Sequence, residues 1–164
     1  MEYCCQVWDP YKVQLIDALE QVQRSLTAKI EFMDELNYWD RLKALNIMSL
    51  QRRREKMAIL YVWKIKNKQA PNDINLEFSH SHRRSNQIAI VKPMPKVRGR
   101  LLSMYDNSFV VKAAKLWNKL PSNLSDIPTL VNFRRELQKY LSLYPDNPPI
   151  KGYFHSNNNS IFEY

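Results

Sequence analysis

The chain contains little glycine and no long apolar run. Only two of its 164 residues are glycine. Asn-Gly and Asp-Gly turns, which favour tight β-hairpins, are therefore absent, and so are the glycine-rich loops that bind phosphates. The longest apolar run, Met57–Trp63, is much shorter than the roughly 20 residues that a membrane-spanning helix needs. A protein made mainly of helices, joined by loops that contain Pro and Asn, is what remains.

Cysteine is also scarce, and metal-binding and catalytic signatures are missing. Cys4 and Cys5 are adjacent, while His80 and His82 are two positions apart. Neither pair has the Cys-x₂₋₄-Cys or His-x₃₋₅-His spacing that lets zinc ligands converge tetrahedrally. No Gly-x-Ser-x-Gly or His-Glu-x-x-His motif occurs, and there is no Asp-Asp pair anywhere. We therefore predict no catalytic residue, no metal ligand and no cofactor in this chain.

The amino terminus does not resemble a signal peptide. It begins Met-Glu-Tyr-Cys-Cys, with neither a basic segment nor a long apolar stretch. We expect an intracellular protein, in the nucleus or the cytoplasm, whose two cysteines are reduced.

Apolar periodicity and capping residues predict about five helices. The first begins at Asp9-Pro10, where Asp would cap the open amides and Pro would suit the first turn. Its apolar residues share one helical face: Leu15, Leu19, Val22, Leu26 and Ile30. A brief helix over 38–46 follows, with Asn37 as its cap and with Tyr38, Leu42 and Leu45 on one side.

Three further helices complete the predicted helical domain. Ser49 caps a helix that reaches about Lys68, with an inner face of Leu50, Met57, Tyr61 and Ile65. Two further helices cover about 107–119 and about 129–143, the first ended by Pro121 and the second preceded by Pro128. We predict a mainly α domain over 1–143 and an extended, irregular tail over 144–164.

The segment between Asn72 and Asp106 loses the helical period. Ile88–Val91 has β-strand character, and Leu101–Tyr105 is a candidate partner for it in a short hairpin around 87–105. An ordered loop and a mobile loop are the alternatives.

The net charge of +9 favours a polyanionic partner such as nucleic acid, with a solvated basic surface as the alternative. No acidic residue occurs between Phe78 and Tyr105. Three groups of cations are candidates for phosphate contacts. They are Arg52, Lys56 and Lys66 on the Ser49 helix; Arg83, Arg84, Lys92, Lys96, Arg98 and Arg100 in the loop; and Lys112, Lys115 and Lys119 around Trp117. Trp63 would either stack on a sugar or base, or be buried.

Several short segments follow one another in a recognisable order. They are Tyr3–Tyr11 (Tyr-Cys-Cys-Gln-Val-Trp-Asp-Pro-Tyr), Leu19–Arg24, Tyr38–Leu45, Ser49–Arg54, Tyr61–Ile65, Leu116–Pro121 (Leu-Trp-Asn-Lys-Leu-Pro) and Phe133–Leu141. This order and spacing resemble the C-terminal region of reverse transcriptases from non-LTR (LINE-type, jockey-like) retrotransposons. The resemblance covers nearly the whole chain, from about Tyr3 to Tyr153.

The resemblance implies a thumb and C-terminal segment that follows a catalytic palm and grips the template–primer. The implied function is non-catalytic, sequence-independent binding of RNA, DNA or their hybrid in support of RNA-directed DNA synthesis. The palm and fingers, with their Tyr-x-Asp-Asp turn and Mg²⁺, would be supplied elsewhere. Met1 falls inside a stretch that the family continues upstream, so we expect an internal methionine of a 5′-truncated element. Truncation would expose apolar surface.

Two other interpretations remain open at the level of sequence. In one, the chain is a helical protein-interaction module whose partner is anchored by Trp39, Trp63 and Trp117. In the other, it is a truncated transposon relic without a selected function. Salt dependence of binding would separate phosphate gripping from protein interaction.

Overall fold

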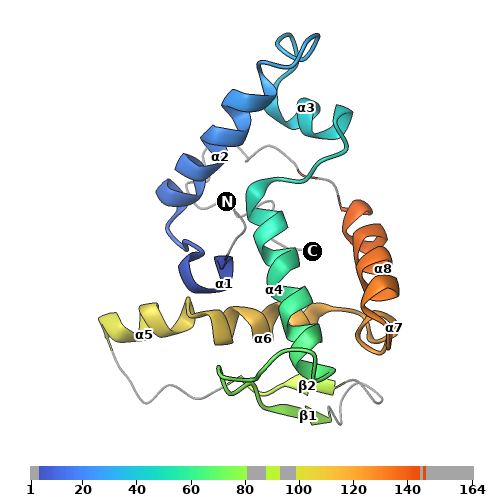
Figure 1. Ribbon diagram of the computed structural model, residues 1–164. Coiled ribbons are helices and arrows are strands. Elements are labelled where there is room, and N and C mark those ends of the chain that lie inside the picture. Colours follow the sequence, from blue (N-terminus) through green and yellow to red (C-terminus); the bar gives the residue numbers. More distant parts are fainter. Residues whose placement is uncertain (1–3, 81–87, 93–98, 145, 147–164) are drawn as a thin grey trace. The chain divides into compact units, whose positions relative to one another are not determined.

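The computed structural model describes residues 4–80, 88–92, 99–144 and 146 of the chain. Within these residues the fold is mainly α, as the sequence predicts, with eight helices and one pair of strands (Figure 1). None of the helices described there is both long and apolar enough to cross a membrane.

The elements follow in chain order. They are α1 (Cys5–Trp8), α2 (Val13–Thr27), α3 (Tyr38–Ala44), α4 (Leu50–Lys66), β1 (Phe78–His80), β2 (Ile88–Ile90), α5 (Arg100–Asp106), α6 (Phe109–Lys119), α7 (Ser122–Ser125) and α8 (Leu130–Ser142). The five predicted helices are confirmed as α2, α3, α4, α6 and α8, and the short α1, α5 and α7 were not predicted.

The caps of α3 and α4 are confirmed, while the predicted start of α2 is wrong. Asn37 accepts hydrogen bonds from the amides of Trp39 and Asp40, both at 3.1 Å. Ser49 Oγ accepts one from the amide of Arg52 at 3.3 Å. By contrast, α2 begins after Lys12, and the Asp9 carboxylate is paired with Arg54 Nε at 2.6 Å.

The strand at Ile88–Ile90 is confirmed, but its predicted partner is wrong. β2 pairs with β1 in antiparallel register, with Phe78 opposite Ile90 and Ser79 opposite Ala89. Leu101–Tyr105 lies in α5 instead. That segment contains no β-branched residue and no glycine, so its local preference is helical.

The described residues divide into two compact units. Unit 1 comprises those of Met1–Lys56 and Leu141–Tyr164, and unit 2 those of Met57–Tyr140. The division falls within α4, which is buried on most of its sides. The inner face predicted for it is therefore incomplete, since Ile59, Val62 and Trp63 are 0% exposed while Met57 and Tyr61 are only half-buried.

Unit 2 is built around three aromatic rings. Phe133 of α8 stacks on Trp63 with ring centroids 5.6 Å apart, and its ring lies 6.2 Å from that of Trp117. All three side chains are fully buried. Each indole nitrogen finds a backbone acceptor at 2.9 Å: the carbonyl of Ile127 for Trp63 and that of Ile88 for Trp117. Of the two interpretations of Trp63, burial is the one observed.

Unit 1 is held together largely by polar contacts. The buried Glu20 carboxylate accepts hydrogen bonds from the Tyr38 hydroxyl and, at 3.1 Å, from the amide of Leu50. Gln23 Nε2 donates to the carbonyl of Met48 at 3.0 Å. Asp146 accepts from both the amide and the hydroxyl of Ser49 at 2.8 Å. Asp146 lies in the predicted irregular tail, yet it is 5% exposed and belongs to this network.

Candidate nucleic-acid interface

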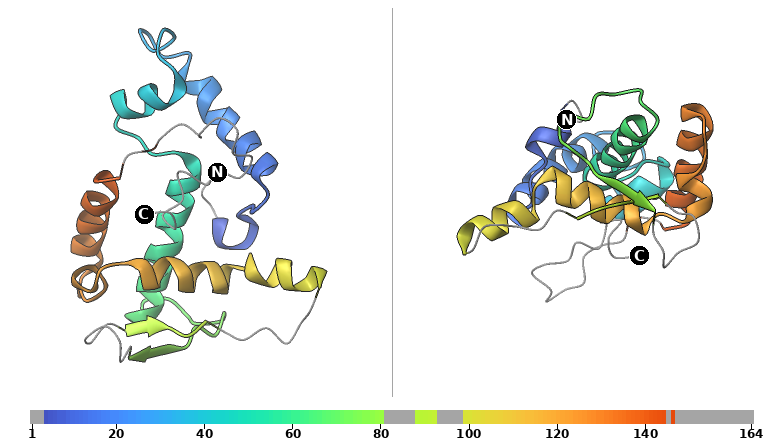
Figure 2. Two further views of the ribbon diagram at one scale, coloured as in Figure 1. Left: turned by 180° about the vertical axis from the view of Figure 1, so that it is seen from behind. Right: turned by 90° about the horizontal axis from the view of Figure 1, so that it is seen from below.

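The segment Leu116–Pro121 fixes the position of α6 within unit 2. Leu116, Trp117 and Leu120 are at most 1% exposed. The side-chain amide of Asn118 bonds the edge of β2, because its Oδ1 accepts from the Ile90 amide and its Nδ2 donates to the Ile90 carbonyl, both at 2.9 Å. Two further views show β2 lying along α6 (Figure 2). The helix is thus attached to both the core and the sheet.

The face of α6 opposite this anchor carries a line of cations. Lys112, Lys115 and Lys119 follow one another at spacings of three and four residues, which places them on one side of a helix. Lys115 and Lys119 are exposed, and Lys112 is half-buried. They extend over about 10 Å of helix axis, roughly the length of three nucleotide steps of one DNA strand. We call these three residues the α6 lysine line.

The predicted cations of α4 do not form a second line. Arg52 is 1% exposed, its guanidinium lies 3.7 Å from Asp146, and it donates to the carbonyl of Tyr144. Lys66 Nζ donates to the Ser125 carbonyl at 2.6 Å and lies 5.6 Å from the centre of the Trp117 ring. Lys56 is half-buried. Arg52 and Lys66 therefore serve the packing of their units in this structure, and their role as phosphate contacts stays a prediction.

Most of the predicted loop cations lie outside the described residues, namely Arg83, Arg84, Lys96 and Arg98. Arg100 is the first residue of α5. Lys92 is half-exposed and lies 3.8 Å from the carboxylate of Asp106. The loop thus stays a prediction.

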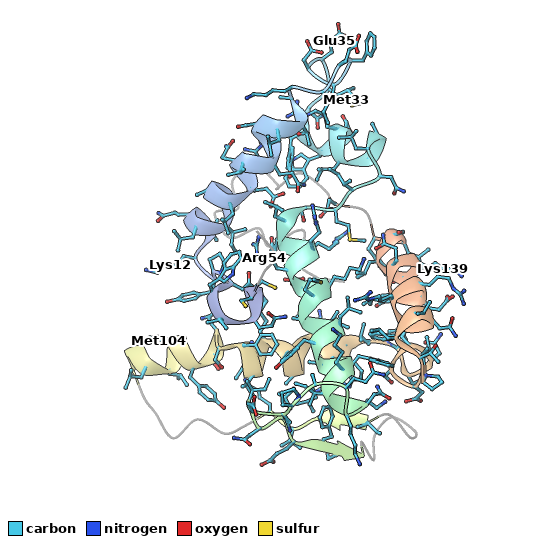
Figure 3. The ribbon with its side chains drawn as sticks, viewed as in Figure 1. Lys12, Met33, Glu35, Arg54, Met104 and Lys139 are labelled. Atoms are coloured by element: carbon cyan, nitrogen blue, oxygen red, sulfur yellow. The ribbon has the colours of Figure 1, made fainter. Side chains whose placement is uncertain are left out.

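The sequence interpretation missed the cations of α8. Arg134, Arg135 and Lys139 are exposed, and Lys139 points outward from the helix (Figure 3). Hydrogen bonds from Lys139 and Arg135 hold the pKa of Glu136 below its usual range, so this carboxylate stays ionised and neutralises part of the local charge. The sequence does contain a signal for them, the Arg134-Arg135 pair directly after Phe133. If Phe133 faces the core, helical periodicity places both arginines away from it.

The Trp-anchored interface considered above is not available. Trp63 and Trp117 are both 0% exposed, and both indole nitrogens are bonded within unit 2. Only Trp39 of the three retains partial exposure.

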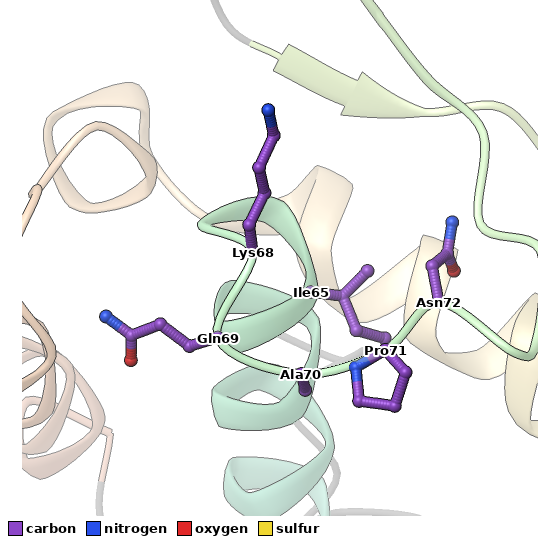
Figure 4. Close-up of a pocket in the computed structure, with 6 residues that line it drawn as sticks. All are labelled: Ile65, Lys68, Gln69, Ala70, Pro71 and Asn72. Carbon is purple, nitrogen blue, oxygen red and sulfur yellow. The ribbon is translucent and has the colours of Figure 1, made fainter.

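The described residues were also compared with the requirements of a pocket and of a metal site. An open hollow of about 460 Å³ lies at the end of α4, lined by Ile65, Lys68, Gln69, Ala70, Pro71 and Asn72 (Figure 4). These side chains include no carboxylate, thiol or imidazole. Among the described residues, no three His, Cys, Asp or Glu side chains are grouped so that they could hold a metal ion.

Comparison of the chain with protein-family models, with curated proteins and with solved structures found no match. The resemblance to reverse transcriptases therefore stays a hypothesis that rests on the segments quoted above.

Proposed function

We propose that this chain is a non-catalytic, nucleic-acid-gripping segment of the kind found at the C-terminal end of LINE-type reverse transcriptases. Its ligand would be RNA, DNA or their hybrid, bound without sequence preference. Polymerisation would require a palm and fingers, with Mg²⁺, that are separate from the residues described here. The chain itself would supply grip and no chemistry.

The observation that carries this proposal is the α6 lysine line, whose last member, Lys119, lies within Leu116–Pro121, one of the segments that resemble the family. The apolar residues of Leu116–Pro121 pack inward, while Lys119 is exposed beside them. Rigid support matters because a cation that is already positioned loses less conformational entropy when it binds a phosphate. A charge of +9 on the whole chain adds long-range attraction.

The test is the salt dependence of binding by the full chain. Fluorescence anisotropy with a labelled RNA–DNA hybrid would be followed from low to moderate salt for the parent and for Lys112→Ala/Lys115→Ala/Lys119→Ala. If each lysine neutralises one phosphate, we expect the slope of log K against log salt to become shallower by about 2.7. The loss should be similar for hybrids of different sequence.

The matched control removes three exposed lysines of unit 1, with Lys12→Ala/Lys29→Ala/Lys43→Ala. Its net charge equals that of the α6 variant, so the two variants differ only in where the lysines are removed. If the α6 lysine line contacts the phosphates, the control should lose much less of the slope. Equal losses in the two variants would show that binding depends on the net charge of the chain and not on the α6 lysine line. A salt-independent affinity in the parent would overturn phosphate binding altogether.

The predicted loop is tested in the same assay by Arg98→Ala/Arg100→Ala. Weaker binding with unchanged folding would add the loop to the interface. Unchanged affinity would remove it and leave the α6 lysine line.

A protein-interaction module remains the second candidate, for a different reason from the one expected. The candidate surface for a protein partner is the group of exposed apolar side chains on α2, and not the tryptophans. A relic without a selected function would show neither salt-dependent grip nor specific association.

A further inference from the structure

We propose that two copies of this chain associate through α2, with the two helices packed antiparallel. This inference concerns unit 1 alone. It goes beyond nucleic-acid binding and does not depend on it.

The first argument is the exposure of an apolar stripe. Leu15, Val22, Leu26 and Ile30 are 53%, 42%, 61% and 42% exposed, and Leu19 between them is half-buried. Leu15, Leu19, Val22 and Leu26 lie within α2, which runs from Lys12 toward the loop that carries Met33 and Glu35 (Figure 3). Ile30 continues the stripe in the turn after the helix. A contiguous apolar surface of this kind is typical of an interaction site.

The second argument is that unit 1 uses a different side of α2. Glu20, Gln23 and Thr27 are 5%, 7% and 4% exposed, and they lie about a quarter-turn around the helix from the stripe. Their polar groups bond Tyr38, Leu50, Met48 and the Arg41 guanidinium. The polar side of the helix is therefore inward and satisfied, which leaves the apolar side for another surface.

The third argument is that the stripe matches itself when reversed. An antiparallel copy centred between Val22 and Gln23 places Leu15 opposite Ile30 and Leu19 opposite Leu26, with Val22 beside its own copy. From Leu15 to Leu26, the steps of four, three and four residues are those of a packed helical seam. Such a two-fold interface needs a surface that is complementary to itself.

The fourth argument is charge. Within α2 and the turn after it, the exposed Asp17 lies in the first half, and Arg24 and Lys29 follow in the second. Antiparallel packing places each half against the oppositely charged half of the copy, while parallel packing would place like charges together. The helix dipoles also favour antiparallel packing over parallel packing.

The experiment measures oligomeric state by sedimentation velocity on nuclease-treated full-length protein, up to about 200 µM and over a wide range of concentration. We expect a dimer that dissociates on dilution. Leu26→Glu should abolish it with an unchanged circular dichroism spectrum. The matched control is Val131→Glu on α8, an apolar residue that is 76% exposed outside the stripe, and it should leave the dimer intact.

Orientation is tested by disulfide trapping in a Cys4→Ser background, since Cys4 is the exposed native cysteine. Mixing Leu15→Cys with Ile30→Cys protein should give linked heterodimers, while neither should link to itself. Efficient self-linking would show parallel packing and overturn the proposed geometry. A parent that stays monomeric throughout, or a dimer that survives Leu26→Glu, would overturn the interface and leave α2 as a surface for a different polypeptide.

Discussion

At the scale of single residues, the fold favours the neutral form of the Tyr38 phenol. Burial and the neighbouring Glu20 raise its pKa well above the ordinary value for a tyrosine. The folded chain therefore holds the phenolic proton more tightly than the unfolded chain does. Its contribution to stability is complete below about pH 10 and is lost as the pH rises further.

The first residue-scale prediction follows from that sign. Denaturant titrations at rising alkaline pH should show the parent losing up to about 1.4 kcal/mol per pH unit more than Tyr38→Phe does. Tyr11→Phe is the control, since Tyr11 is 47% exposed, and it should follow the parent. Parallel pH curves for the parent and Tyr38→Phe would show that Tyr38 does not titrate differently on folding.

Lys68 has a strained, left-handed backbone conformation that glycine would adopt without strain. After α4 the amide of Gln69 bonds the carbonyl of Lys64 at 2.8 Å and that of Lys68 bonds Ile65 at 3.1 Å, which is a Schellman ending. Lys68 occupies the left-handed position with φ of 56°, where most helices place glycine. In a chain with two glycines, a lysine fills the place instead.

We therefore expect Lys68→Gly to stabilise the chain by about 0.5–1 kcal/mol, as relief of left-handed strain exceeds the added freedom of the unfolded chain. Asn46→Gly is the matched control, because Asn46 ends α3 in the same way with φ of 51° and asparagine tolerates that conformation. Its gain in thermal unfolding should be smaller. A loss of stability in Lys68→Gly would mean that the lysine side chain matters more than the strain.

At the scale of elements, α4 begins on two carboxylates from distant parts of unit 1. Asp146 bonds the amide of Ser49, and Glu20 bonds that of Leu50. Both lie at the positive end of the helix, where a negative charge is favourable. Asp146 also faces the buried Arg52, so it compensates a charge that has no access to water.

Asp146→Ala should therefore destabilise the chain by about 3–5 kcal/mol, because it removes the carboxylate that faces the buried Arg52 and accepts from Ser49. The control is Asp126→Ala, whose partner Lys66 lies 3.6 Å away and whose own side chain is 53% exposed. That change should cost less than about 1 kcal/mol. Equal midpoints for Asp146→Ala and the parent in urea unfolding would show that the Asp146 contacts add nothing.

Elements also show where local patterns stop being sufficient. The caps Asn37 and Ser49 were readable because the bonding partners lie within three residues. The partner of β2 could not be predicted in this way, since Leu101–Tyr105 and Phe78–His80 both lie near enough in sequence to pair with it. Asn118 occupies one edge of β2 with its side chain, a contact across 28 residues that no local pattern signals.

At the scale of the whole molecule, two surfaces of opposite character carry the two proposals. The α6 lysine line belongs to unit 2 and suits phosphates, while the apolar stripe of α2 belongs to unit 1 and suits a copy of itself. Their tests are independent, because one reads salt dependence and the other reads mass. A dimer would also double the number of lysine lines per particle and raise the avidity for a long nucleic acid.

The sequence by itself determined the class of fold, the positions of five of the helices and two of their caps. These properties depend on residues within a turn or two of one another, so periodicity and capping chemistry are enough to predict them. It also supplied the cations from which any nucleic-acid interface must be drawn.

Only the tertiary structure decided which sides of those helices are covered. Arg52 and Lys66 were predicted as surface cations, yet each is bonded by a partner far away in sequence, Asp146 at 94 residues and Ser125 at 59. Arg52 is buried as a result. The amphipathic pattern of α2 likewise could not reveal that its polar side faces inward, because Tyr38 and Leu50 supply the groups that satisfy it. Burial is a property of contacts between distant segments, and local periodicity carries no record of them.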